Sequence, residues 1–208
     1  MATQQLGFHV DMSTCLGCRT CTIACKDKND LDVGQLYRKV VEVEGGDYTV
    51  KGNAVIPNVF AYWISISCNH CSEPRCLQNC PTGAITKREQ DGVVTINQDV
   101  CIGCRYCVWS CPYGAPQYNA SKGKTGKCNL CIELIEKGQE PACVTACPVR
   151  AIHVGPVAGL KKQFGGTMQL TSLPDPALTK PNSLYTPHRD AVRGDQLRHA
   201  AAAPTERR

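Results

Sequence analysis

The cysteines of this 208-residue chain carry its most specific signal. All sixteen fall into four successive groups of four, with none left over. Four thiolates per group is the number that one [4Fe–4S] cluster takes. The sequence therefore predicts four [4Fe–4S] clusters, with electron transfer as their chemistry. The groups are Cys15, Cys18, Cys21 and Cys25; Cys68, Cys71, Cys76 and Cys80; Cys101, Cys104, Cys107 and Cys111; and Cys128, Cys131, Cys143 and Cys147.

The spacing within each group favours cubane clusters. The first and third groups have the C-x2-C-x2-C-x3-C spacing of bacterial ferredoxins, and Pro112 follows the third. The second group widens one gap to four residues and the fourth widens it to eleven, but both still end C-x3-C-P. Two residues between ligands place three thiolates on one tight loop. The fourth thiolate then binds the other cluster of a two-cluster fold.

This rule assigns ligands once the groups are paired. Strand-like segments 84–86 and 93–96 flank the turn Asp91-Gly92 and join the second group to the third as a hairpin. The first and fourth groups then pair across the sequence, where segments 8–10 and 152–154 are predicted to lie antiparallel. The expected sets are Cys15, Cys18, Cys21 with Cys147; Cys128, Cys131, Cys143 with Cys25; Cys68, Cys71, Cys76 with Cys111; and Cys101, Cys104, Cys107 with Cys80.

The elements that position these loops indicate an α+β fold of two nested ferredoxin-like modules, with inserted β-hairpins and an extended C-terminal arm. Residues 80–85 and 147–152 repeat a Cys-Pro-x-x-Ala-Ile text, which indicates an internal duplication. We expect one module from 1–30 plus 120–160 and the other from 68–119. Residues 31–67 form an inserted β segment, and 161–208 an extended partner-binding tail.

Local patterns predict the remaining elements. Segments 40–43 and 48–50 flank Gly45-Gly46-Asp47 as a hairpin, and 59–67 is a further strand. Short helices are expected around 26–31, 129–137 and 158–164, with a connecting loop at 112–127. Four prolines between 174 and 187 predict an extended arm, and residues after Arg193 are expected to be disordered. The apolar residues expected to bind a partner are Leu173, Leu178, Leu184 and Tyr185.

Composition limits the other classes of function. The net charge of +5 comes mainly from residues 161–208, which hold eight Lys/Arg and four Asp/Glu without interleaved aromatics, so nucleic acid is not an expected partner. Met1–Val10 is mixed and polar, which predicts no signal peptide of the chain's own. No apolar stretch approaches the roughly 20 residues of a membrane-spanning helix. No nucleophile–base pair or phosphate-binding loop is visible, so no catalytic residue is expected.

Other cysteine chemistries remain as alternatives. A C-x2-C pair with a second cysteine pair downstream, such as Cys128/Cys131 and Cys143/Cys147, would also suit tetrahedral zinc, although three further groups beside them favour iron–sulfur clusters. Disulfides fit poorly, because partners within one loop would leave little chain to cross-link. Near the clusters, His70, Arg105, Tyr106 and Trp109 are expected to pack or to adjust a cluster through hydrogen bonds and solvent exclusion.

Two stretches carry a closer likeness. Residues 65–71 read Ser-Ile-Ser-Cys-Asn-His-Cys, and residues 101–119 run from Cys-Ile-Gly-Cys-Arg-Tyr-Cys to Cys-Pro-Tyr-Gly-Ala-Pro-Gln-Tyr-Asn. From about residue 7 to 181, the chain resembles the electron-transfer beta subunits of dimethyl sulfoxide reductase-type molybdoenzymes. In nitrate reductase relatives, a tryptophan at the position of Cys104 converts one cluster to [3Fe–4S]. Keeping Cys104 favours four cubanes, while Lys26 departs from the proline common after the first group.

The resemblance implies a complex with a molybdopterin catalytic subunit and an integral membrane anchor that oxidises quinol. Electrons would enter at the cluster of Cys101/Cys104/Cys107/Cys80 and leave from that of Cys15/Cys18/Cys21/Cys147. Export with the catalytic subunit's twin-arginine signal would place the chain at the periplasmic face of the cytoplasmic membrane, bound through its partners. The alternatives are the same relay for thiosulfate, polysulfide, arsenate or formate enzymes, a free polyferredoxin, and a zinc-binding assembly module.

Metal analysis separates the cluster hypothesis from zinc. Four cubanes require about sixteen irons and as many inorganic sulfides per chain. We expect that content in anaerobically purified protein, measured by iron and acid-labile sulfide assays. About four zincs per chain, without sulfide or visible absorbance, would contradict the prediction.

Overall fold

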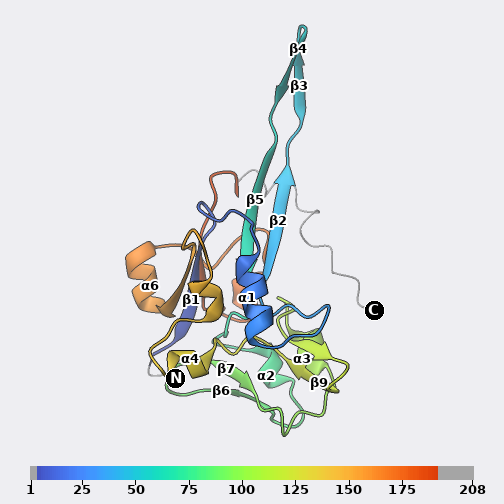
Figure 1. The fold of residues 1–208 in the computed structure, drawn as a ribbon, viewed down its shortest axis with the longest axis vertical. Coiled ribbons are helices and arrows are strands. Elements are labelled where there is room, and N and C mark those ends of the chain that lie inside the picture. Colours follow the sequence, from blue (N-terminus) through green and yellow to red (C-terminus); the bar gives the residue numbers. More distant parts are fainter. Residues whose placement is uncertain (1–3, 192–208) are drawn as a thin grey trace.

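A three-stranded sheet joins segments that are far apart in the sequence. The computed structural model describes residues 4–191 (Figure 1). Its central strand β1 (Leu6–Asp11) pairs antiparallel with β10 (Ile152–Pro156) and parallel with β11 (Ser183–Thr186). The register pairs Phe8 with Val154 and Val10 with Ile152. The antiparallel pairing predicted for 8–10 and 152–154 is therefore confirmed, and it places the strand before the first cysteine group beside the strand after the fourth.

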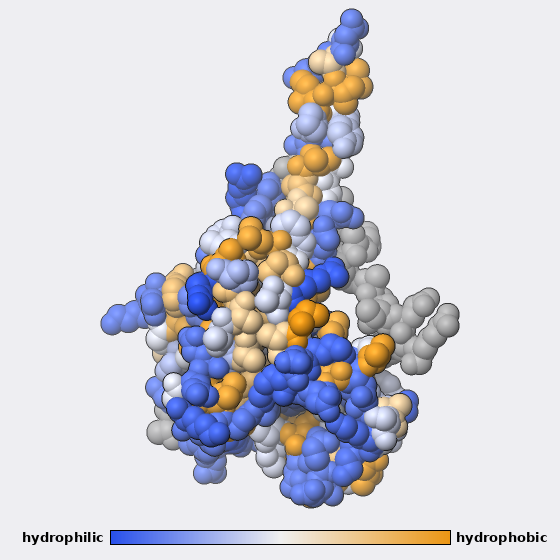
Figure 2. Space-filling view, viewed as in Figure 1, coloured by the Kyte–Doolittle hydropathy of each residue, from blue (hydrophilic) through white to orange (hydrophobic). Residues whose placement is uncertain are grey.

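A long two-stranded arm projects from the body (Figure 1). Its base pairs β2 (Lys39–Gly45) with β5 (Phe60–Ile66), and its tip pairs β3 (Tyr48–Lys51) with β4 (Ala54–Pro57). All side chains of β3 and β4 are exposed, and Figure 2 shows apolar surface among polar groups there. The strand expected at 59–67 is confirmed as β5.

The hairpin predicted around Gly45-Gly46-Asp47 is wrong. These residues form a break within one side of the arm, and the chain reverses at Gly52-Asn53 instead. Gly46 has a φ of 98°, and a Cβ there would stand 2.1 Å from the carbonyl oxygen of Asn58 on the returning side. Glycine is thus needed at this position for close approach of two backbones, and the Gly-Asn pair is the turn signal that the prediction overlooked.

Short elements surround the cysteine loops. The expected hairpin between the second and third groups is present as β6 (Ile85–Lys87) and β7 (Val94–Ile96). Residues 112–127 are more than a loop, because β8 (Gln117–Asn119) and β9 (Lys124–Gly126) form a hairpin within them. The helices are α1 (Thr20–Lys28), α2 (Arg75–Gln78), α3 (Tyr106–Ser110), α4 (Ile132–Ile135), α5 (Ala142–Thr145) and α6 (Val157–Phe164), with a 3-10 turn η1 (Pro176–Leu178).

Two helix predictions need correction and one is confirmed. The helix expected at 26–31 begins earlier, as α1, because the chain turns helical directly after Arg19. The helix expected at 129–137 is confined to Ile132–Ile135, since Leu130 and Cys131 have positive φ values of 62° and 51° that a right-handed helix excludes. The helix expected at 158–164 is present as α6.

The C-terminal segment packs against the rest of the protein. Leu184 and Tyr185 are 1% and 2% exposed because β11 is a strand of the central sheet, so the prediction that these two residues bind a partner is wrong. Leu173 is also partly buried, whereas Leu178 is 47% exposed. Parallel pairing with β1 provides hydrogen-bond partners for the backbone of β11. The prolines that predicted an extended arm give no sign of this pairing. The disorder predicted after Arg193 lies outside the described residues.

The core crosses the boundary expected between the two modules. One buried cluster combines Phe8 and Ile152, from the outer module expected around the first and fourth groups, with Val93 and Ala115, from the inner module expected around the second and third. Within residues 4–191, no helix has the length and apolar character needed to span a bilayer. The fold is thus mixed α and β, with small sheets and short helices around the cysteine loops.

Burial of β11 predicts its importance for stability. We expect Leu184→Ala to destabilise the protein by about 2–5 kcal/mol, because it leaves a cavity in the core. The matched control Leu178→Ala truncates an exposed side chain and should cost less than about 0.5 kcal/mol. Urea unfolding of the purified protein, followed by circular dichroism, measures both. Equal urea midpoints for the two variants would contradict a structural role for β11.

Candidate metal centres

The first and third cysteine loops share one backbone conformation. Gly17 and Arg19 have φ values of 68° and 60°, and Gly103 and Arg105 repeat them at 69° and 66°. A Cβ at Gly17 would stand 2.5 Å from the Trp63 ring, so β5 packs directly on this loop. Left-handed residues between the ligands curl each loop back on itself. The helices α1 and α3 begin just after these arginines and carry the next thiolates inward.

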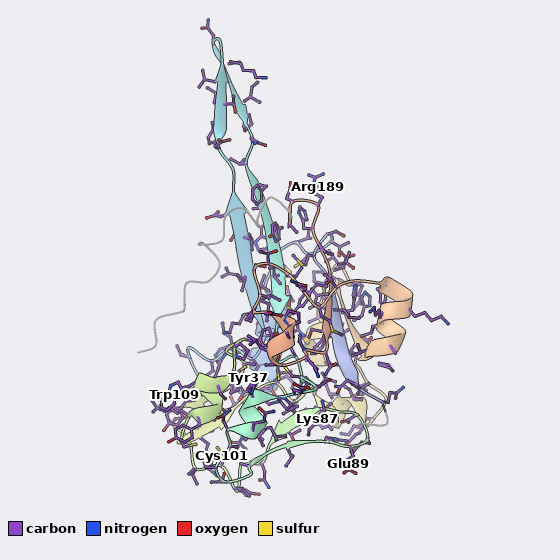
Figure 3. All side chains as sticks on the ribbon, turned by 180° about the vertical axis from the view of Figure 1, so that it is seen from behind. Tyr37, Lys87, Glu89, Cys101, Trp109 and Arg189 are labelled. Atoms are coloured by element: carbon purple, nitrogen blue, oxygen red, sulfur yellow. The ribbon has the colours of Figure 1, made fainter. Side chains whose placement is uncertain are left out.

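Two cavities gather two of the predicted ligand sets. Each is lined by three cysteines of one group and the last cysteine of its neighbouring group. The first is lined by Cys68, Cys71, Cys76 and Cys111, and the second by Cys80, Cys101, Cys104 and Cys107. Figure 3 shows Cys101 and Trp109 in the part of the body farthest from the tip of the arm. The last cysteines of the second and third groups therefore each line the cavity of the other group, which is where the spacing rule expects them.

Electrostatic neighbours reveal the other two groupings. Burial raises the pKa of Cys15, and the nearby sulfurs that add to this are those of Cys21, Cys147 and Cys18. Burial likewise raises the pKa of Cys25 to about 11, and here the contributing sulfurs are those of Cys143 and Cys131.

Cys128 has Cys143 and Cys25 as neighbours and also lies near Cys68 of the inner module. The structure thus brings all sixteen cysteines into the four groupings expected from the sequence. In these groupings Cys147 is next to the first loop, and Cys25 is next to the fourth.

Several of the sulfurs accept hydrogen bonds. The backbone N–H groups of Leu130 and Ala151 donate to Cys128 Sγ and Cys147 Sγ at 3.4 and 3.3 Å. The Thr20 hydroxyl donates to Cys18 Sγ at 3.3 Å, and this bond lowers the pKa of that exposed thiol. Such donors stabilise thiolates, the form that binds iron.

Two buried cations and one half-buried cation provide a test of whether the sites fit iron–sulfur clusters. Arg38 and Lys127 are buried and Lys87 is half-buried, and within residues 4–191 none of the three forms a salt bridge with an Asp or Glu. A buried, uncompensated cation is costly. Each of the three lies instead beside cysteines. Clusters with four thiolate ligands are anionic, so they would supply the missing negative charge.

Each grouping adjoins the next in a succession that we call the line of groupings. Cys21 of one set and Cys143 of the next both act on the buried Arg38, which links the first group's set to the fourth group's set. Cys128 neighbours Cys68, which links the fourth group's set to the second group's set. Cys76 and Cys107 then share one buried apolar cluster, which links the second and third. Among the described residues, no three His, Cys, Asp or Glu side chains converge as a single metal ion requires, whereas a cubane binds each ligand to a different iron.

Residues expected near the clusters take different positions. His70 is buried; its Nδ1 accepts the Val94 N–H at 3.0 Å, and burial with the nearby Lys127 and Lys87 holds its pKa well below the ordinary value. Tyr106 and Trp109 are 52% and 59% exposed, so they border the third loop from the surface.

Arg105 stacks on the Tyr118 ring with 3.8 Å between its guanidinium carbon and the ring centroid. The burial of Arg38 and Lys127 was not predicted, because nothing in the neighbouring sequence distinguishes these two residues from surface charges.

Comparison with known proteins identifies the family. A model of the 4Fe–4S dicluster domain matches residues 59–157. A component chain of the anaerobic dimethyl sulfoxide reductase of Escherichia coli is 48% identical over 186 residues, which cover 89% of this protein and 90% of that one. The Haemophilus influenzae protein of the same description is 43% identical over 189 residues, or 90% of this protein and 92% of its own length.

This protein belongs to the iron–sulfur chain family of anaerobic dimethyl sulfoxide reductases. It is an electron-transfer protein that carries [4Fe–4S] clusters, which confirms the chemistry expected from the cysteine spacing. More distant similarity extends to a subunit of the sulfite dehydrogenase of Allochromatium vinosum, 37% identical over 174 residues covering 74% of this protein and 69% of that one.

The exchange of fourth cysteines can be tested with paired variants. If Cys147 and Cys18 bind the same cluster, Cys147→Ser and Cys18→Ser should alter the same electron paramagnetic resonance (EPR) signal of the reduced protein. Cys143→Ser and Cys25→Ser should together alter a different one. The expected change is loss of one cubane signal, or its conversion to a three-iron signal, with the other three retained. The assignment fails if Cys147→Ser and Cys143→Ser change one common signal.

Proposed function

We propose that this protein is the non-catalytic subunit that relays electrons through four [4Fe–4S] clusters between a quinol-oxidising membrane anchor and a molybdopterin catalytic subunit of the dimethyl sulfoxide reductase type. The four cysteine groupings would be the ligand sets, within the two modules described above. The relatives named as dimethyl sulfoxide reductase chains are more similar and cover more of the protein than the sulfite dehydrogenase relative does, which favours that reductase type.

The observation that carries the proposal is the linear order of the groupings. They run from Cys15/Cys18/Cys21/Cys147 through Cys128/Cys131/Cys143/Cys25 and Cys68/Cys71/Cys76/Cys111 to Cys101/Cys104/Cys107/Cys80. When bound, each cluster accepts and releases one electron at a time. The protein's part is to exclude water, to donate hydrogen bonds to the sulfurs and to hold cations beside them. A line of such sites suits the connection of two partners that each handle two electrons.

Exposed apolar side chains lie at both ends of this line. Leu16 and Ile23, each 62% exposed, flank the first loop, and Ile102, Tyr106 and Trp109 surround the third. Apolar and aromatic groups exposed in this way are typical of protein–protein interfaces. We assign the Leu16 end to the catalytic subunit and the Trp109 end to the anchor. The protein would then be peripheral to the cytoplasmic membrane, at its periplasmic face, and exported with the catalytic subunit.

Electron relay and catalysis can be measured separately by supplying electrons from two different donors. In membranes that hold the complete complex, we expect omission of this protein to abolish quinol-driven dimethyl sulfoxide reduction. A reduced artificial dye that delivers electrons directly to the catalytic subunit should still support it. Trp109→Asp should weaken anchor binding about tenfold or more, as loss of a hot spot of about 2 kcal/mol does, and should lower only the quinol-driven rate.

Val50→Asp is the matched control, because Val50 is 69% exposed in β3, at the tip of the arm, and the third loop lies in the part of the body farthest from that tip. It should leave both rates unchanged. Quinol-driven reduction that persists at the full rate without this protein would overturn the proposed function. A Trp109→Asp variant with full quinol-driven activity would overturn the assignment of that end to the anchor.

A further inference from the structure

Arg38 is a buried cation held between two strands and two ligand sets. It is 1% exposed, and its guanidinium carbon lies 4.4 Å from the centroid of the Phe8 ring. Nη1 donates to Ser65 Oγ and Nη2 donates to Ser67 Oγ, both at 3.0 Å. Neither hydroxyl carries a charge. The guanidinium therefore depends on other groups for its compensating negative charge.

Those groups are cysteine sulfurs. Burial lowers the pKa of Arg38, but nearby sulfurs reverse this and hold it above its ordinary value. The guanidinium is thus charged under all ordinary conditions. It lies between the first and fourth loops, because the sulfurs that act on it come from both. They belong to Cys143, Cys128, Cys21 and Cys25.

Ser65 connects this charge to one sulfur. It is 2% exposed, and its Oγ lies 3.5 Å from Cys21 Sγ. An arginine N–H can only donate, so the Ser65 oxygen must be the acceptor of the bond from Arg38. The hydroxyl proton of Ser65 is then free to point at Cys21. The direction of the relay follows from hydrogen-bonding capacity: Arg38 donates to Ser65, and Ser65 donates to the sulfur.

We propose that Arg38 and Ser65 form a hydrogen-bond relay that raises the reduction potential of the cluster bound by Cys15, Cys18, Cys21 and Cys147. This proposal rests on the proposed function, because that function includes the cluster at these four cysteines. Reduction adds one electron to the cluster and makes or breaks no bond. A donor to the ligand sulfur and a nearby positive charge both favour the more negative, reduced state. Ser65 contacts the ligand, whereas Arg38 is a positioning residue that orients Ser65.

The relay acts at one end of the line of groupings. A higher potential there would favour the arrival of electrons at the loop that carries the exposed Leu16 and Ile23. Ser65 lies at the end of β5, in the base of the arm, so the long hairpin that displays its tip to solvent also supplies the donor. The inserted β segment therefore does more than carry the tip of the arm. It holds Ser65 against the sulfur of Cys21, a cluster ligand.

The test is a set of midpoint potentials. Full-length protein containing its clusters is titrated anaerobically with dithionite, and each cluster is followed by its EPR signal. The signal of interest is the one altered in Cys18→Ser. We expect Ser65→Ala to shift the midpoint of this cluster to a more negative potential and to leave the other three unchanged. Ser65→Thr retains the hydroxyl and should restore the potential of the unsubstituted protein.

Ser67→Ala is the matched control. It makes the same chemical change on the same guanidinium, but no sulfur lies within hydrogen-bond distance of the Ser67 hydroxyl in residues 4–191. It should leave the midpoint of the Cys18 cluster unchanged. Arg38→Gln provides a second route, because Ser65 without its donor can turn its proton elsewhere, and the same cluster should shift in the same direction.

An unchanged midpoint in Ser65→Ala, with iron and sulfide content intact, would overturn the relay. Equal shifts in Ser65→Ala and Ser67→Ala would do the same, since they would indicate a general effect of packing. If Ser65→Ala does not retain its clusters, the midpoint of Ser65→Val, which has the shape of Ser65→Thr without its hydroxyl, decides by the same criterion. These potentials are measured without partner subunits. The relay can therefore fail while quinol-driven activity persists, and the proposed function can fail while the shift is observed.

Discussion

Attraction between buried cations and cysteine sulfurs is the constraint on which the rest of this structure depends. The core of the protein contains Arg38 and Lys127, and Lys87 is half-buried nearby; among the described residues none of the three forms a salt bridge to a carboxylate. The same core contains thiols whose pKa is raised by burial and by one another, to about 12 for Cys76. Neither set is stable alone. Anionic clusters resolve both problems, because iron takes up the thiolates and the net negative charge compensates the cations.

This coupling makes folding and metal binding parts of one process. The body has short helices and small sheets, and several of its buried apolar positions are cysteines. Loops with repeated left-handed residues gain little from regular hydrogen bonding and are held by what they bind. The surrounding strands provide the fixed frame. The central sheet brings the two ends of the described residues together, and β5 closes over the first loop through Trp63 and Ser65.

The arm and the C-terminal segment differ in how much of each packs against the body of the protein. The base of the arm is a structural part of the body, whereas its tip has no buried side chain. The C-terminal segment looks extended and unsupported in the sequence, yet it completes the central sheet, and Asn182 donates to the backbone oxygen of His70 at 2.8 Å beside the second loop. Besides those at the tip of the arm, exposed apolar groups are found near the first and third loops, at the two ends of the line of groupings.

The sequence by itself determined the chemistry, because iron–sulfur ligation is local: two-residue gaps bring thiolates together whatever the rest of the protein does. It also predicted the groupings, through the spacing rule and the strand-like segments 8–10 and 152–154 that flank the first and fourth groups. Tertiary structure decided how far the arm extends, because the close approach of Gly46 to Asn58 continues both sides of the arm past Gly45-Gly46-Asp47, where the sequence predicts a turn. It alone revealed Arg38 and Ser65, because a residue 27 positions from its partner carries no mark of that contact in the sequence. Burial and hydrogen-bond geometry arise only when the chain packs in three dimensions. That packing places Arg38 and Ser65 next to Cys21, a predicted cluster ligand.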